Sequence, residues 1–273
     1  MQNPHLPPEI LDYIVDFLHD NPGILRACSL ASKSWIPRAR KHLFAEVNLR
    51  TQTDLESWKK LFPDPSTSPA HFTTSLHVGC ARVVTAADSE VGGWITGFAH
   101  TVRLNLETYE PYPRSYTLFP TPKRLPVSLV PFHGFFPAAK SLRVDTINIP
   151  PSKILDFVLS TPLLEDLTVS GSLVWPDDGD GSDGLPTFVQ PSNPPMLSGS
   201  LELFLKEEMK PVVNRLLSIP SGIHFRKLTL EWHSEEDLPS IVALVEGCSH
   251  TLESFKITCY LDGTSIRYLR PHR

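Results

Sequence analysis

The sequence lacks any apolar run of about 18 residues or more, the length at which a stretch becomes a candidate transmembrane helix. It also does not open with the basic and apolar segments that make up a secretory signal peptide. We therefore expect no membrane partner. We expect a soluble protein inside the cell, in the cytoplasm, the nucleus or both.

Cysteine is scarce as well. The 4 cysteines, at positions 28, 80, 248 and 259, form no CxxC pair. Closely spaced pairs are typical of structural zinc sites, and dense cysteine is typical of small secreted disulfide scaffolds. Scattered thiols are usually small buried apolar side chains in a reducing compartment, and this is our interpretation here.

The chain has no excess of positive charge, since 25 Lys and Arg stand against 30 Asp and Glu, for a net charge of −5. Binding to phosphates depends on clustered cations, so we expect no nucleic acid partner. Common catalytic and cofactor motifs are missing too: GxSxG, HExxH and a Gly-rich phosphate loop do not occur, and the 11 His are dispersed. We predict a protein that is not an enzyme, with no catalytic residues and no cofactor.

One acidic, Gly-rich segment, residues 177–184, invites comparison with a calcium loop. An EF-hand loop needs oxygen ligands at positions 1, 3 and 5, Gly at 6 and Glu at 12. Counted from Asp178, Asp183 stands where Gly belongs and Val189 where Glu belongs. We interpret the segment as a solvated loop and predict no metal site.

What the sequence has in abundance is proline, with 27 residues among 273, about twice the average usage. Prolines at that density indicate many short elements. A hydrophobic content of 41% is ordinary for a globular protein and suffices for one large core or two modest ones.

The first 46 residues predict three short helices. Pro7–Pro8 suits the first turn of a helix, where a missing N–H costs nothing. Asn21–Pro22 reads as an N-cap followed by a first-turn proline. Ser34 can cap a third helix, with Pro37 in its first turn. Three such helices bury too little apolar surface to be stable alone, so we expect the unit to need a partner.

This stretch resembles an F-box. The resemblance rests on Leu-Pro-x-Glu-Ile at residues 6–10, spaced apolar residues after it, Ser-x-x-Trp at 32–35 and Leu-Phe at 43–44. Two positions depart from the family pattern: Ser32 stands where Cys is frequent, and Phe44 where Trp is frequent. The resemblance implies docking onto a Skp-type adaptor and, through it, a cullin-RING ubiquitin ligase. The alternative is a small helical cap on a larger domain.

By this resemblance, a set of mostly apolar side chains would form a partly buried face that the adaptor completes. The adaptor-binding residues would be Leu6, Pro7, Ile10, Ile14, Leu18, Leu25 and Trp35.

After the helices, an apolar–polar–apolar triplet recurs eight times, and strict alternation predicts short strands with one buried face. The triplets begin at Val47, Leu76, Leu104, Leu142, Leu167, Leu201, Leu228 and Phe255, at spacings from 25 to 38 residues. Helical patterns lie between most of them. The arrangement resembles the irregular leucine-rich repeats found in F-box proteins, although their regular Asn or Cys after the strand does not recur. We therefore predict an α/β fold: a helical F-box domain (1–46) and a leucine-rich-repeat-like solenoid with parallel strands (47–273).

Two segments interrupt the rhythm, and we interpret both as surface insertions. They lie near 108–131, including Pro-rich Arg114–Pro131, and near 176–195, which we expect to be disordered. At the end of the chain only 16 residues follow Ile257 (273 − 257). We expect the last strand to be bare, or partly covered by Ile266, Tyr268 and Leu269.

These patterns favour a substrate-receptor subunit of an SCF-type ubiquitin ligase. The apolar residues of each strand would be buried, and the opposite, polar face of the strands would bind an unknown target protein. Along that face Phe204 is the one aromatic residue among polar ones, and Arg143, Glu202 and Glu231 are charged. We predict target binding by Arg143, Glu202, Phe204 and Glu231. The alternative is a non-catalytic repeat scaffold with no role in a ligase.

Overall fold

The computed structural model describes residues 7–79, 91–107, 134–146, 151–171, 195–205, 209–261 and 264–269. Leu6, the Arg114–Pro131 segment, the acidic Gly-rich segment and all but the last residue of the 176–195 segment lie outside the described residues. Their predicted roles therefore stay predictions.

The chain begins with a small helical unit made of α1 (Pro8–Phe17), α2 (Pro22–Ala31), the 3-10 turn η1 (Lys33–Trp35) and α3 (Ile36–Leu43). The predicted N-cap at Asn21 is confirmed, because its side chain accepts a hydrogen bond from the backbone N–H of Ile24 at 3.1 Å. The predicted cap at Ser34 is wrong. The third helix starts one turn earlier, as η1, so the Ser32 side chain is the cap.

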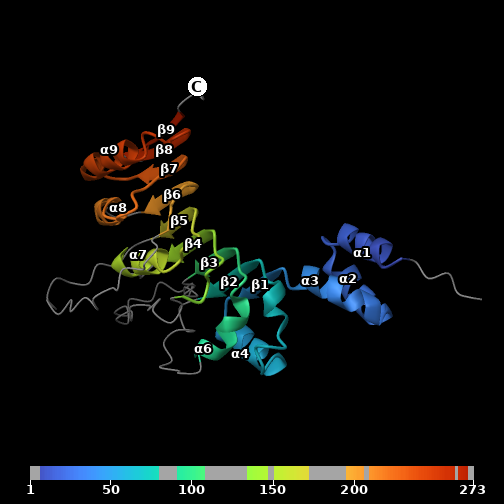
Figure 1. The fold of residues 1–273 in the computed structure, drawn as a ribbon. Helices are drawn as coiled ribbons and strands as arrows, with labels where there is room; N and C mark the ends of the chain where they lie inside the picture. The colour runs from blue at the N-terminus through green and yellow to red at the C-terminus, as the bar shows by residue number, and fades with distance from the viewer. Residues whose placement is uncertain are drawn as a thin grey trace, which may run out of the picture.

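The helical unit has its own small core of Val15, Leu25 and Ala39, against which Leu18, Trp35 and Leu43 pack. It projects from the β1 end of the sheet, and α3 leads directly into β1 (Figure 1). This core is separate from that of the sheet.

The rest of the described chain is one sheet with the strand order β1-β2-β3-β4-β5-β6-β7-β8-β9. The strands are β1 (Glu46–Leu49), β2 (Ser75–Gly79), β3 (Arg103–Glu107), β4 (Ser141–Thr146), β5 (Asp166–Gly171), β6 (Ser200–Leu205), β7 (Lys227–Trp232), β8 (Ser254–Leu261) and β9 (Thr264–Leu269). β1 to β8 are parallel, each pairing with the next strand along the chain. The predicted α/β class with parallel strands is confirmed.

All eight predicted triplets lie in strands and stand in register. The first residues of the triplets are successive register partners from Val47 on β1 to Phe255 on β8, whatever the length of chain between them. The shared register places the apolar residues of every strand on one face.

Helices cover that apolar face. They are α4 (Gln52–Leu61), α6 (Val91–Ile95), α7 (Pro151–Leu159), α8 (Lys210–Leu217) and α9 (Leu238–Gly247), with 3-10 turns η2 (Pro69–Phe72), η3 (Thr96–Phe98) and η5 (Glu235–Asp237). α7, α8 and α9 lie together along one side of the sheet (Figure 1). Buried residues of strands and helices form one continuous core. Burying each large apolar side chain contributes about 1.5–3 kcal/mol.

Of the two alternatives expected for the last parallel strand, the bare strand is wrong, and cover by the segment that contains Ile266, Tyr268 and Leu269 is what the structure has. β9 turns back and pairs antiparallel with β8, with Ile266 opposite Cys259 and Tyr268 opposite Ile257. A hairpin needs only a short connection, whereas another parallel strand would need a crossover of a dozen or more residues. Only residues 262 and 263 separate β8 from β9, which suffices for a hairpin and not for a crossover.

Candidate protein-interaction surfaces

Helix α1 carries two apolar stripes on different sides. Leu11, Val15 and Leu18 face inward, and the Val15 side chain is 0% exposed. Ile10, Tyr13, Ile14 and Phe17 form a second stripe, here called the outer stripe, whose members are all exposed; Tyr13 is 71% and Phe17 79% exposed. Positions i, i+3, i+4 and i+7 share one side of a helix, so these four side chains make a coherent apolar surface.

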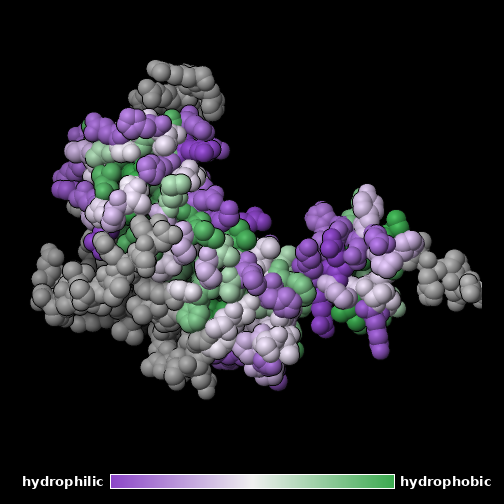
Figure 2. Space-filling model, in the orientation of Figure 1, coloured by the Kyte–Doolittle hydropathy of each residue, from purple (hydrophilic) through white to green (hydrophobic). Residues whose placement is uncertain are grey.

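Helix α2 likewise has a buried apolar side and exposed apolar residues. Leu25 and Cys28 are buried, whereas Ile24 and Leu30 are exposed. Figure 2 shows hydrophobic side chains on the surface of the helical unit. Single exposed apolar residues are normal, but apolar side chains gathered at helical spacing on a small unit indicate an interaction surface.

The residues predicted to bind an adaptor fall into three groups. Pro7, Ile10 and Ile14 are exposed, as a partner surface requires. Leu18 and Trp35 are half-buried against the core of the helical unit. Leu25 is 1% exposed, so its expected place on the partly buried face needs correction: it belongs to the core.

Tyr13, Phe17, Ile24 and Leu30 were not among the predicted contacts, although they are more exposed than Ile14. Their spacing was readable from the sequence, because positions 10, 13, 14 and 17 form a stripe distinct from positions 11, 15 and 18. What the spacing could not tell is which of the two stripes faces the other helices.

An ionic cluster joins α1 to α3. The Arg38 guanidinium donates hydrogen bonds to both carboxylate oxygens of Asp16, and His42 Nε2 lies 2.7 Å from Asp16 Oδ1. Hydrogen bonds from Arg38, and then from His42, hold the pKa of the Asp16 carboxyl well below its usual value. The ionised carboxylate therefore helps to fix α1 and its outer stripe relative to α3.

The second candidate surface is the face of the sheet opposite the helices, here called the open face. Its central row runs Asn48, His77, Asn105, Arg143, Thr168, Glu202, Thr229 and Lys256, which are successive register partners. The residues of this row are exposed or half-buried, whereas most of their neighbours along each strand are buried. Because strand side chains alternate between faces, a polar row lines the open face.

Short polar contacts organise the β1–β3 end of the open face. His77 Nε2 lies 3.2 Å from Asn105 Nδ2 and 3.5 Å from Glu46 Oε1, and the Arg50 guanidinium lies 3.7 Å from a Glu107 oxygen. Here each acidic side chain is close to a basic group. The charged groups at this end of the face are therefore largely paired with one another.

All four residues predicted to bind a target lie on the open face, on β4, β6 and β7. Arg143 sits apart and has a partner of its own, Asp145, at 3.8 Å. Glu202 and Phe204 lie two residues apart on β6, and Glu231 follows Leu230, the register partner of Leu203, on the adjacent strand β7.

Two further side chains next to Glu231 were not predicted as binding residues. The His233 and Tyr260 rings are stacked, with centroids 5.0 Å apart, and His233 Nε2 lies 3.9 Å from a Glu231 oxygen. Only the pairing of β7 with β8 brings Tyr260 to His233.

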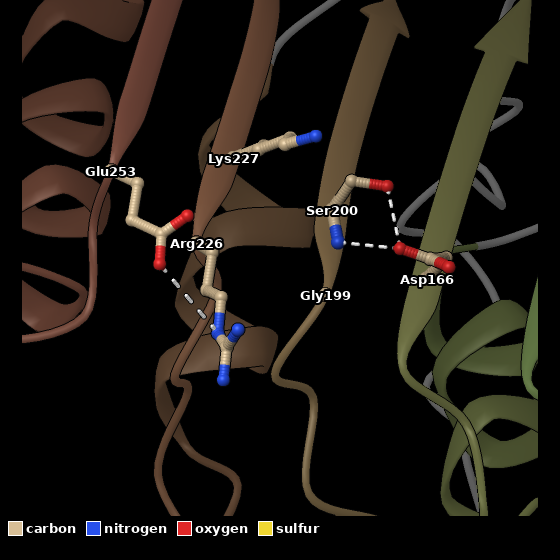
Figure 3. Close-up of a pocket in the computed structure, with 6 residues that line it drawn as sticks. All are labelled: Asp166, Gly199, Ser200, Arg226, Lys227 and Glu253. Carbon is tan, nitrogen blue, oxygen red and sulfur yellow. Dashed lines mark hydrogen bonds and ion pairs between the residues drawn. The ribbon is translucent and has the colours of Figure 1, made fainter. Parts of the chain in front are cut away.

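A hollow of about 290 Å³ lies where strands β5 to β8 begin, lined by Asp166, Gly199, Ser200, Arg226, Lys227 and Glu253 (Figure 3). The Ser200 N–H and hydroxyl donate to Asp166 Oδ1 at 2.6 and 2.7 Å, and Arg226 lies 4.0 Å from Glu253. These contacts tie the starts of neighbouring strands to one another. Most of the polar groups of the hollow are thus satisfied within the chain.

The described residues include no group of three His, Cys, Asp or Glu placed to hold a metal ion. Burial raises the pKa of the Cys248 and Cys259 thiols, so both stay protonated and weakly nucleophilic at neutral pH. Within the part of the chain that the structure describes, the helices are too short or too polar to cross a bilayer. What the geometry offers chemically is two surfaces for contact with other molecules.

The comparisons with known proteins add no relative to this picture: no family model, no curated protein and no solved structure matches the chain.

Proposed function

We propose that the chain is the substrate-receptor subunit of a cullin-RING ubiquitin ligase of the SCF type. In this proposal residues 1–46 are an F-box that docks onto a Skp-type adaptor. Residues 47–273 form a leucine-rich-repeat-like domain whose open face binds a target protein. The chain itself performs no catalysis and positions the target for the ligase.

The observation that carries the proposal is the outer stripe of α1. A helical unit whose own core consists of Val15, Leu25 and Ala39 leaves larger apolar side chains, Tyr13 and Phe17, in solvent. Covering those side chains with a partner removes apolar surface from water, which contributes about 25 cal/mol per Å². The stripe also follows directly on the Leu-Pro-x-Glu-Ile motif that resembles an F-box.

The open face supports the second half of the proposal. Parallel sheets are rarely left uncovered on one side, and repeat proteins with a helix-covered outer side use the uncovered strand face for binding. Here that face is polar along its central row and carries an aromatic side chain, Phe204, among charged residues.

Binding to a purified Skp-type adaptor tests the proposal. The variant of choice is Tyr13→Ala with Phe17→Ala, because both side chains are exposed and their removal leaves the core of the helical unit intact. Trp35→Ala is a poorer choice, since Trp35 packs on that core. An interface anchor contributes about 2 kcal/mol or more, so we expect adaptor affinity to fall by about 30-fold or more.

The matched control is Arg40→Ala on α3, an exposed change that leaves the outer stripe untouched. It should bind the adaptor as the wild type does. Wild-type protein that fails to bind any Skp-type adaptor, or a double variant that binds equally well, would contradict the proposal. The first result would favour the alternative of an interaction scaffold with no role in a ligase.

A further inference from the structure

The open face at β6 and β7 has an arrangement of charge that selects for one kind of target side chain. Phe204 is two residues along β6 from Glu202, and Glu231 is on the adjacent strand β7, one residue after the register partner of Leu203. Neighbouring strands lie about 4.8 Å apart, and residues two apart on a strand lie about 6.6 Å apart. Both carboxylates are therefore within reach of a group that lies on the Phe204 ring.

Within the described residues, neither carboxylate forms an ion pair with a Lys or Arg side chain. Glu202 accepts one long hydrogen bond, 3.4 Å, from the Thr168 hydroxyl. Glu231 has His233 at 3.9 Å, and His233 Nε2 is buried without a hydrogen-bond partner in the part of the chain described. In contrast, the nearby carboxylate of Asp145 has the Arg143 guanidinium at 3.8 Å.

Among the described residues, none of the ion pairs joins a Lys or Arg to Glu202 or Glu231. Arg143 is two strands from Glu202 in the central row. The nearest lysines are each one strand away and diagonal: Lys227 to Glu202, because Ser200 is the partner of Lys227, and Lys256 to Glu231, because Thr258 is the partner of Glu231. The Lys227 side chain extends from β7 toward β6 (Figure 3).

We infer that Glu202, Phe204 and Glu231 form a binding site for a Lys or Arg side chain carried by an extended segment of a target protein. The aliphatic stem of that side chain lies on the Phe204 ring, and the cationic group takes hydrogen bonds and charge from the two carboxylates. Contact of a cation with an aromatic face contributes about 0.5–1 kcal/mol at exposed sites, and hydrogen bonds between charged groups are stronger than neutral ones. The inference rests on the proposed target-binding role of the open face.

Selection of peptides from a random 12-residue display library on the full-length chain tests the inference. We expect the selected peptides to be enriched in Lys and Arg over Asp and Glu, and their affinity to weaken as salt is raised. The variant Glu202→Gln with Glu231→Gln keeps the shape of both side chains and should bind the selected basic peptides at least tenfold more weakly.

Asp145→Asn is the matched control, because it removes a carboxylate from the same face that already has a partner in Arg143. It should leave the basic preference intact. Selection of acidic or uncharged peptides, selection of none, or equal binding by the double Gln variant with an unchanged melting temperature would each overturn the inference.

Adaptor binding, measured on the same protein preparations, separates this inference from the proposed function. Retained adaptor binding without a basic preference rejects the inference alone. A basic preference without adaptor binding rejects the ligase role and leaves the recognition site standing.

Discussion

Leu142 and Arg143 are neighbours in the chain, but their side chains lie on opposite faces of the sheet. Leu142 is 1% exposed and belongs to the core under the helices, whereas Arg143 lies on the open face with Asp145 as its partner. The same alternation holds on each side of β4, because Leu104 and Leu167 are the register partners of Leu142. A single residue step along a strand therefore separates the buried core from the open face.

This relationship gives a first prediction. Leu142→Ala should lower the free energy of unfolding by about 2–5 kcal/mol, because it leaves a cavity in a packed core. Arg143→Ala should change it by about 0.5 kcal/mol or less, as surface substitutions do. Urea unfolding of both variants measures the difference, and equal losses would contradict the assignment of the two faces.

A second prediction concerns Gly79, the last residue of β2. A Cβ atom at this position would lie 1.9 Å from the backbone oxygen of Arg50, which follows β1. Gly79→Ala must therefore push the ends of β1 and β2 apart, and we expect a loss of about 1–3 kcal/mol in unfolding free energy.

Gly93→Ala is the control for this change. A Cβ atom at Gly93, in α6, would meet nothing within 4 Å. Because Ala stabilises a helix by about 1 kcal/mol relative to Gly, this variant should be as stable as the wild type or slightly more so. A Gly79→Ala protein with an unchanged melting temperature would show that the ends of β1 and β2 can move apart without a loss of stability.

A third prediction concerns pH. The fold depresses the pKa of Asp16 through Arg38 and His42, so the cluster stabilises the helical unit above the ordinary Asp pKa of about 3.9. That stability is lost as the pH falls below this value, because protonation then favours the unfolded chain. At neutral pH Asp16→Asn should melt at a lower temperature than the wild type.

The gap in melting temperature between the two proteins should narrow as the pH is lowered from about 5 toward 2. Thermal unfolding followed by circular dichroism at several pH values measures it. A gap that stays constant across this range would mean that ionisation of Asp16 contributes nothing to folding.

A fourth prediction concerns β9. Deleting residues 262–273 removes β9 and makes β8, whose Ile257 and Cys259 are buried, the edge strand in its place. Exposed edges template association between molecules, so we expect lower solubility and a lower melting temperature. Deleting only residues 270–273 keeps β9 and serves as the control. Equal solubility and stability of both truncated proteins would show that β9 does not protect β8 from association between molecules.

Much of the sheet was predictable from local patterns. The eight apolar–polar–apolar triplets gave every parallel strand, because burial of one face imposes a period of two on the residues themselves. Asn21 before Pro22 likewise marked the start of α2. The corrections at Leu25 and β9 concern what a segment packs against or pairs with, whereas the one at Ser34 moves a helix start by one turn.

The candidate binding residues, too, were predictable in part from the sequence. The residue types on the open face followed from alternation, so Arg143, Glu202, Phe204 and Glu231 could be assigned to one face. Their grouping could not, because which strands are neighbours, and in which register, depends on pairing between segments 25 to 38 residues apart.

The sequence by itself determined the parallel strands, the starts of α1 and α2 and the polarity of each strand face, because these depend on contacts within a few residues of one another. Only the tertiary structure decided which apolar stripe of α1 is buried and why Leu25 is a core residue. It also decided that Arg143 pairs with Asp145, whereas no Lys or Arg of the described residues pairs with Glu202 or Glu231. These properties belong to side chains from segments far apart in the chain. The free energies of these contacts depend on distance and burial in the folded molecule, and a local sequence pattern contains neither.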